Sequence, residues 1–233
     1  MTALLGGCMS LHVLAQDDYE VSSFAEHDLL NIHLAAVAGF PTQELKDAVH
    51  NTFGNMGIGL SAGVLVNPFG KKKPSPVFPG VNFDYLLYGV DKIPETAQHP
   101  KIRTTYNIYT IQGALRLMPF QEGGFVPYLD GMLGTRIFNT RSKAILDEPE
   151  QIHSTNDAGL NYVLGVGFYT RKPNEDKEDV TPSFTLRVLY YWGDDVKYVV
   201  RDSFTIDSDD VVHFDTDYTR TSMFMIQLGV MLH

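Results

Sequence analysis

Cysteine is nearly absent from this chain, which contains a single one, Cys8, among 233 residues. One cysteine excludes an intrachain disulfide and a zinc site built from cysteine ligands. Positive charge is also scarce, since 18 lysines and arginines stand against 28 aspartates and glutamates and leave a formal net charge of −10. Binding to nucleic acid requires a basic surface. The composition therefore argues against a nucleic-acid partner.

Long hydrophobic runs are missing as well. No stretch inside the body of the chain approaches the ~20 apolar residues that a membrane-spanning helix requires. The hydrophobic content of 44% still suits a membrane β-barrel, because alternating lipid-facing and interior residues hide the hydrophobicity of such a protein from averages. The 20 glycines and 12% aromatic residues favour many strands and tight turns over a helical bundle.

The segment 222–232 shows the clearest pattern in the chain. Large apolar residues, among them Phe224 and Leu228, alternate with a mixed set that includes Met225 and Gln227. A period of two over this length predicts a strand with one apolar and one mixed face. We expect the apolar face to contact lipid and the mixed face to line a barrel interior, with this strand closing the ring.

Seven further segments repeat the two-faced pattern: 30–40, 57–66, 81–88, 108–117, 127–137, 160–169 and 184–193. Each approaches or reaches the ~9–11 residues that a tilted strand needs to cross a bilayer. Together they predict an all-β fold: an eight-stranded antiparallel up-and-down transmembrane β-barrel, formed as a single domain by residues 29–233. We expect the final strand to pair with both 30–40 and 184–192.

Charged residues recur on the mixed face of these strands. An eight-stranded barrel is only just wide enough for its side chains to fill. Charges inside it are tolerated when they meet one another and water instead of lipid. The sequence therefore predicts an interior polar network that plugs the barrel, built from Asp84, Arg116, Asp130, Arg136 and Arg187.

The connections between the predicted strands alternate in length. Short or moderate turns are expected at 67–74, 119–124 and 173–182, and four longer loops at 42–53, 91–103, 140–158 and 194–220. Bacterial barrels place short turns in the periplasm and long loops outside, so both termini are expected in the periplasm. Residues 44–51 could form a short helix in the first loop, and residues 196–218 predict a hairpin that projects beyond the membrane.

The first residues look like an export signal. An apolar stretch ends in Val13-Leu14-Ala15 and is followed by the polar Gln16-Asp17-Asp18, as a signal peptidase site requires. We expect residues 1–15 to be a signal peptide and residues 16–28 a periplasmic segment. Two other interpretations stay open: a lipoprotein signal at Leu5-Gly6-Gly7-Cys8, or an N-terminus that is retained.

From about residue 29 to the end, the chain resembles the small outer-membrane β-barrel proteins common in Bacteroidota, the OmpX-like and PorT-like group. The resemblance rests on Ala38-Gly39-Phe40-Pro41 before Glu44-Leu45-Lys46-Asp47, on the glycine-rich 57–63, and on two middle segments, 125–131 and 164–168. These motifs are structural and not catalytic. The resemblance implies a barrel in the outer membrane of a Gram-negative cell, and it implies no activity.

Two charged loops are candidate binding sites. Asp207, Asp209 and Asp210, with Asp215 and Asp217 nearby, could bind a cation through carboxylate oxygens. They lack the loop pattern of an EF-hand, and a solvated acidic loop is the simpler interpretation. Residues 71–73, all lysine, could meet anionic lipid headgroups or form a plain turn.

Catalysis has little support in the sequence. A barrel hydrolase or acyltransferase would need a nucleophile and a base near the outer rim; His33, Ser61, His153 and Ser154 are the available parts, without a Gly-x-Ser-x-Gly motif. We therefore expect a non-enzymatic membrane anchor or docking surface without cofactor or metal. Its expected partners are outer-membrane lipid and other proteins of an envelope or secretion assembly. A small channel, a lipid-modifying enzyme and a soluble lipid-binding barrel are the alternatives.

Overall fold

The computed structural model describes residues 29–49, 55–70, 73, 75–95, 101–121, 123–145, 151–170, 182–206 and 212–232. The expected signal peptide and the segment 16–28 lie outside these residues. Within them the chain forms the strands β1 (Leu30–Pro41), β2 (Gly57–Val66), β3 (Val77–Ile93), β4 (Lys101–Leu117), β5 (Phe125–Ile145), β6 (Gln151–Thr170), β7 (Pro182–Gly193), β8 (Asp195–Ile206), β9 (Val212–Arg220) and β10 (Met223–Leu232), and the helix α1 (Gln43–Ala48). No helix in this part of the chain is long and apolar enough to cross a membrane.

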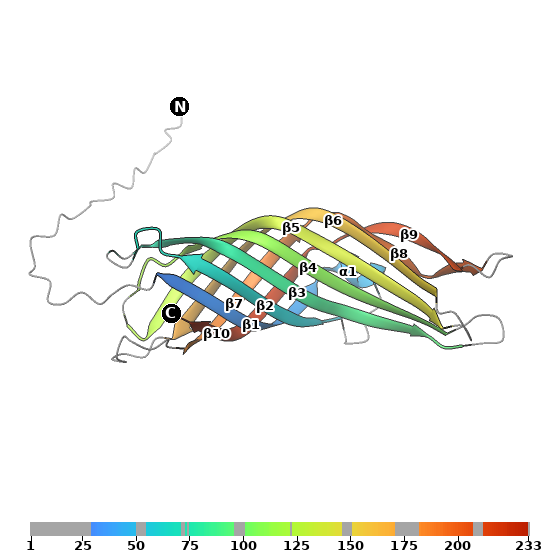
Figure 1. The fold of residues 1–233 in the computed structure, drawn as a ribbon, viewed down its shortest axis with the longest axis horizontal. Helices are drawn as coiled ribbons and strands as arrows, with labels where there is room; N and C mark the ends of the chain where they lie inside the picture. Colours follow the sequence, from blue (N-terminus) through green and yellow to red (C-terminus); the bar gives the residue numbers. More distant parts are fainter. Residues whose placement is uncertain are drawn as a thin grey trace, which may run out of the picture.

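Eight of these strands close into a barrel in the order β1-β10-β7-β6-β5-β4-β3-β2. All neighbours are antiparallel, and β10 pairs with β1 on one side and β7 on the other. The start of β1 and the end of β10 lie at the same end of the barrel (Figure 1). Closure removes every free strand edge of the barrel. The predicted eight-stranded up-and-down barrel and the closing role of its last strand are confirmed.

The faces of the strands also follow the predicted alternation. Large apolar side chains point outward and stay exposed, as in Leu60 (65%), Leu164 (61%) and Ile111 (59%). Charged side chains such as Asp84 and Arg187 point inward and are buried. A soluble lipid-binding barrel requires the reverse, an apolar interior and a polar outside, so the structure does not fit that alternative. An exposed apolar belt around a barrel is the surface that a bilayer covers.

Barrel strands extend into two of the four predicted long loops. β3 and β4 each have 17 residues, β5 has 21 and β6 has 20. Residues 91–93, 101–103, 140–145 and 151–158 therefore continue the barrel strands, and the prediction of loops at 91–103 and 140–158 was wrong. Polar residues in these segments suggested loops. Some of them, such as Lys92 and Arg103, lie on the exposed outward face, whereas the inward face, which includes Tyr106 and Phe138, is buried.

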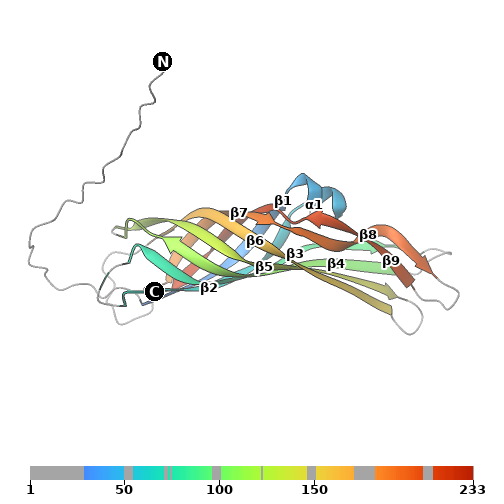
Figure 2. The ribbon, with the colours of Figure 1, turned by 90° about the horizontal axis from the view of Figure 1, so that it is seen from above.

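A hairpin and a helix cover the inner face of these extensions. β8 and β9 pair in a separate two-stranded sheet, which runs beside the outer halves of β5 and β6 (Figures 1 and 2). Val196 and Tyr198 of the hairpin are buried in one apolar cluster with Tyr106, Phe138 and Leu45 of α1. The predicted hairpin at 196–218 and the short helix at 44–51 are thus both confirmed, with slightly different ends.

A β-bulge interrupts the pairing of β3 with β4 between Leu87 and Gly89. A bulge adds one residue to one strand and leaves the partner unchanged. Below the bulge the even-numbered residues of β3 face inward, whereas above it Asp91 is buried and Lys92 is exposed. The bulge therefore determines which charge of this pair faces outward.

Candidate functional site

The middle of the barrel is filled by a network of charged side chains. Arg116 and Asp130 are opposite each other on β4 and β5. Arg116 donates from Nε to Asp130 Oδ1 over 2.7 Å and from Nη2 to Oδ2 over 2.8 Å. Arg187 from β7 donates to the same Oδ2 over 3.2 Å. One carboxylate thus pairs with two buried guanidinium groups.

The guanidinium of Arg116 also lies over an aromatic ring. Its Cζ is 3.7 Å from the ring centroid of Tyr128, a cation–π geometry. The Tyr128 hydroxyl lies 2.8 Å from Thr185 Oγ1. A Cβ on Gly167, the residue opposite Tyr128, would come within 2.6 Å of this ring. The glycine therefore makes room for the tyrosine that supports Arg116.

Arg187 connects the charged pair to the opposite wall. Besides Asp130 it donates to Gln227 Oε1, to Ser61 Oγ over 3.0 Å and to Asn82 Oδ1 over 2.9 Å, and its Nη2 lies 2.8 Å from His33 Nε2. These partners come from β10, β2, β3 and β1. A single side chain therefore links strands from all sides of the ring.

The other two predicted residues occupy different places. Asp84 accepts hydrogen bonds from Tyr191 Oη over 2.7 Å, Asn82 Nδ2 over 2.9 Å and Gln227 Nε2 over 3.2 Å. Through Gln227 it joins the cluster of Arg187. Arg136 is fully buried and does not join the cluster.

Arg136 lies with its Cζ 4.6 Å from the centre of the Tyr191 ring, and it donates to the backbone oxygen of Thr221. The structure thus unites Arg116, Asp130 and Arg187, attaches Asp84 through a neighbour, and places Arg136 nearer the outer end. Asn82, Tyr128 and Tyr191 are further members that the predicted network did not include, although all three share the inward face.

His33 and Ser61 lie inside the plug. Each is only 3% exposed, and both meet Arg187 and Asn82. In the described part of the chain no hydrogen bond joins the Ser61 hydroxyl to the His33 ring. Ser154 is on the outside of β6, where it accepts from Asn139 over 3.3 Å, and the side chain of His153 lies outside the described residues.

Apolar side chains fill the barrel on both sides of the network. The cluster toward the chain termini comprises Leu65, Phe78, Met118, Val126, Tyr128, Tyr169 and Met231. The cluster toward the outer end includes Val37, Leu86, Ile108, Met225 and Met223 and continues into the hairpin. The interior is therefore occupied along its length by an apolar layer, a polar layer and a second apolar layer.

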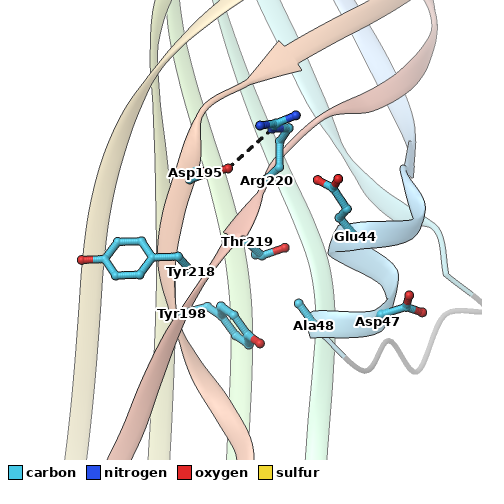
Figure 3. A pocket seen from close by; sticks show the side chains of 8 residues that line it. All are labelled: Glu44, Asp47, Ala48, Asp195, Tyr198, Tyr218, Thr219 and Arg220. Carbon is cyan, nitrogen blue, oxygen red and sulfur yellow. Dashed lines mark ion pairs between the residues drawn. The ribbon is translucent and has the colours of Figure 1, made fainter.

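Outside the barrel, a pocket of about 540 Å³ opens between α1 and the hairpin. Glu44, Asp47, Ala48, Asp195, Tyr198, Tyr218, Thr219 and Arg220 line it (Figure 3). Arg220 Nε lies 3.5 Å from Asp195 Oδ1, and both side chains are more than half exposed. Burial raises the pKa of Tyr198 above its ordinary value, and the nearby carboxylate of Asp217 raises it further. The pocket is acidic and open to solvent.

Two belts of aromatic rings border the exposed apolar surface. Near the outer end, Trp192 stacks on Tyr162 with ring centroids 5.3 Å apart and meets Tyr190 edge-on at 4.5 Å. Toward the opposite end, Phe168 lies 4.6 Å from Phe125 and 6.4 Å from Phe184. Such girdles mark the two membrane–water interfaces of a transmembrane barrel. A pocket of about 670 Å³, lined in part by Trp192 and Tyr162, lies at the outer belt.

The remaining candidate sites are only partly described. Asp207, Asp209 and Asp210 lie outside the described residues, and Asp215 and Asp217 are exposed on β9. Among the residues that the structure describes, no group of three or more His, Cys, Asp and Glu side chains is placed to hold a metal. Of the three lysines at 71–73, only the last is described, and it is exposed.

No family model and no curated protein sequence matches this chain. The fold is similar to the crystal structure of Ail, the attachment invasion locus protein of Yersinia pestis, in complex with the heparin analogue sucrose octasulfate: 11% identity over 87% of this chain and 97% of that one, with a TM-score of 0.50. The crystal structure of Neisserial surface protein A is 13% identical over 88% of this chain and 97% of that one, with a TM-score of 0.45. A second Ail structure is 11% identical over 87% of this chain and 97% of that one, with a TM-score of 0.46. Both proteins are small eight-stranded outer-membrane β-barrels. At this identity the likeness to the first structure shows the fold alone.

Proposed function

We propose that this protein is an integral outer-membrane β-barrel that serves as a non-enzymatic membrane anchor and docking surface. The observation that carries the proposal is the filled lumen: the Arg187 network lies between two apolar layers. Such an interior favours an anchor over an open channel. The parts free to meet a partner are those beyond the outer aromatic belt.

The exposed apolar belt supports insertion in a membrane. It runs around the barrel between the two aromatic belts, and its members include Leu133 (58%) and Leu228 (50%). The connections 67–76, 118–124 and 171–181 join strand ends that lie at the same end of the barrel as the start of β1 and the end of β10 (Figure 1). In the proposed orientation this end is periplasmic, and the strand extensions with their hairpin face the outside. A cleaved signal at residues 1–15 would direct export.

Docking is assigned to the outer end, where α1, the hairpin and the extended strands form a broad folded surface. A loop that served only to connect strands would not need the buried apolar cluster of Val196, Tyr198 and Phe138. The resemblance to the OmpX-like and PorT-like group suggests that the partner is another protein of an envelope or secretion assembly. A pull-down from native membranes would identify this partner.

Planar-bilayer conductance tests the filled lumen. The purified full-length protein should insert and give no single-channel currents, whereas steps of defined conductance would instead support the channel alternative. Heat-modifiable migration on a denaturing gel, with the protein in the membrane fraction, tests the folded barrel and its location. A protein found only in the soluble periplasmic fraction would contradict both.

The non-enzymatic part needs its own test. His33→Ala and Ser61→Ala remove the two buried side chains that could have formed a catalytic pair. Membranes that contain wild-type protein and membranes that contain either variant should process outer-membrane lipids identically. A lipid-processing activity that is present in the wild type and lost in both variants would overturn this part of the proposal.

A further inference from the structure

Positive charges gather on one face of the strand extensions. Lys92, Lys101, Arg103, Arg141 and Lys143, hereafter the basic ladder, all lie on the outward face of β3, β4 and β5. Arg103 stands directly opposite Lys92 on one side and Lys143 on the other. Arg141 lies one row closer to the barrel, opposite Thr105. Five of the 18 basic residues of the chain thus share one small area.

Between the outer aromatic belt and the strand ends, the described residues of this face include no carboxylate; Glu95 is exposed just beyond the end of β3. Its other described side chains are Val90, Thr105, Asn107, Asn139, Ser154, Asn156 and Ala158. The acidic residues of these strands face the other way: Asp91 is 6% exposed, and Asp157 accepts a hydrogen bond from the backbone of Lys197 in the hairpin. This separation of basic and acidic side chains onto opposite faces is unusual for a chain of net charge −10. The β-bulge between Leu87 and Gly89 contributes to it, because it turns Asp91 inward and Lys92 outward.

Lys92 and Arg103 carry like charges and lie directly opposite each other in the ladder. Like charges directly opposite each other on neighbouring strands destabilise a sheet. Within the described part of the chain, Arg103 and Arg141 form no ion pair. An external anion would relieve the repulsion between the rows, and arginine's planar fork can hold a phosphate with two hydrogen bonds at once.

The position of the ladder along the strands indicates which part of the surroundings it faces. The outward face of β4 is continuous with the lipid-facing residues Ile111 and Leu115, so the ladder points sideways and not toward the top of the molecule. Arg103 lies six residues along β4 from Tyr109, whose ring centroid is 5.2 Å from that of Tyr85. At about 3.3 Å per residue and a tilt of ~40°, this places Arg103 roughly 15 Å farther out than Tyr109.

A polar row separates the ladder from the belt. Tyr85 Oη donates to Asn107 Oδ1 over 3.0 Å, Asn107 Nδ2 donates to Asn139 Oδ1 over 3.2 Å, and Asn139 continues the row to Asn156. Aromatic belt, amide row and basic ladder thus follow one another outward on a single face. This is the order in which a lipid's acyl chains, polar linkage and charged headgroup would meet the protein.

We propose that the basic ladder binds the phosphate groups of phosphorylated glycolipids in the surrounding outer leaflet. The proposal rests on the membrane location proposed above. Lys92, Arg103 and Lys143 form one phosphate-binding row, and Arg141 binds from the row below.

The test uses the full-length protein in zwitterionic detergent micelles. Fluorescently labelled lipopolysaccharide, either intact or enzymatically stripped of phosphate, is titrated into wild type, into Arg103→Gln/Arg141→Gln and into the control Lys46→Gln/Lys197→Gln. The control removes the same charge from α1 and β8. We expect the ladder variant to bind intact lipopolysaccharide roughly 25-fold more weakly, about five-fold per charge, at low salt. Wild type should bind the stripped lipid with a similar loss, and the control should change little.

Three results would overturn the proposal. If phosphate removal leaves the affinity of the wild type unchanged, phosphate is not the group that is bound. If the control variant loses as much affinity as the ladder variant, the basic ladder is not the binding site. Binding of inorganic phosphate or a soluble sulfated oligosaccharide without preference for the glycolipid would assign the ladder to a different anion. Heat-modifiable migration of each variant shows that the barrel is folded. Absence of the wild-type protein from native membranes would instead contradict the proposed location. The two failures are distinguishable because the titration in micelles does not depend on where the protein lies in the cell.

Discussion

Asp130 lies directly opposite Arg116 on neighbouring strands and accepts both hydrogen bonds of its guanidinium fork, over 2.7 and 2.8 Å. The same carboxylate also accepts from Arg187 across the lumen. Two side chains that a register of antiparallel strands brings face to face therefore anchor a network that spans the barrel. This relationship makes the polar layer a structural centre of the molecule and leads to the first prediction.

Replacing Asp130 by Asn should destabilise the folded barrel strongly. The change leaves the guanidinium groups of Arg116 and Arg187 buried without their counter-charge, and breaking a buried pair in this way typically costs about 3–5 kcal/mol. Urea unfolding in phosphatidylcholine bilayers, followed by the fluorescence of Trp192, measures the loss. Asp215→Asn on the exposed hairpin is the control and should change the free energy of unfolding by less than about 0.5 kcal/mol. An equal loss of unfolding free energy in both variants would show that Asp130 contributes no more than an exposed carboxylate.

Leu228→Arg should oppose insertion. Leu228 is half exposed and lies between Ala36 and Leu186 in the exposed apolar belt. An arginine on this face is expected to cost about 2–4 kcal/mol at mid-bilayer and less near an interface. The unfolding free energy in bilayers measures this cost. Tyr218→Arg, at an exposed hairpin position, should have almost no effect; a comparable loss there would argue against a membrane around Leu228.

Gly167→Ala should disturb the support of Arg116. The added Cβ would lie 2.6 Å from the Tyr128 ring, which must then leave its place under the guanidinium. Overpacking of this kind typically costs about 1–3 kcal/mol. Gly113→Ala is the matched control, because a Cβ there meets nothing nearer than a backbone oxygen at 3.8 Å. The prediction would be contradicted if the two variants unfolded at the same midpoint.

Trp192 should report the outer membrane interface. It is the only tryptophan of the chain, and it lies in the outer aromatic belt with Tyr162 and Tyr190. Lipids brominated near the headgroup should quench its fluorescence more than lipids brominated near the end of the acyl chain. Strong quenching by aqueous acrylamide, with no effect of either brominated lipid, would place this residue in water and move the boundary of the membrane belt.

The hairpin should loosen at alkaline pH. Burial and Asp217 raise the pKa of Tyr198 in the folded protein, whereas an unfolded tyrosine titrates near ~10. The neutral phenol is thus favoured in the folded state. Its stabilising contribution is complete below pH ~10 and is lost as the pH rises through the folded-state pKa. The difference in tyrosinate absorbance between wild type and Tyr198→Phe should therefore titrate above ~10. A midpoint at or below that value would contradict the assignment.

Much of the fold could be predicted from the order of residues because a strand's side chains alternate strictly. Residues 222–232 show this best: the outward Phe224 and Leu228 and the inward Met225 and Gln227 are as the alternation requires. The same rule placed Arg116, Asp130 and Arg187 inside. It could not say which of these inward residues touch, since contacts across a lumen depend on the relative shift of strands far apart in sequence.

The outer end was harder to predict. Polar residues in 91–103 and 140–158 indicated loops, yet strands extend into both segments, and the hairpin residues Val196 and Tyr198 pack on their inner side with Tyr106 and Phe138. A polar strand becomes stable only when another element buries its apolar side, and that element lies far along the chain. The local sequence carries no sign of this cover.

The sequence by itself determined the two faces of each membrane strand, and with them the number of strands, the closed ring and the charged interior. Only the tertiary structure decided the pairing of charges inside and the basic ladder outside. The ladder depends on one extra residue in β3 between Leu87 and Gly89, which turns Lys92 outward and Asp91 inward. Alternation is a local property of the backbone, whereas register and bulges arise from the packing of the whole barrel.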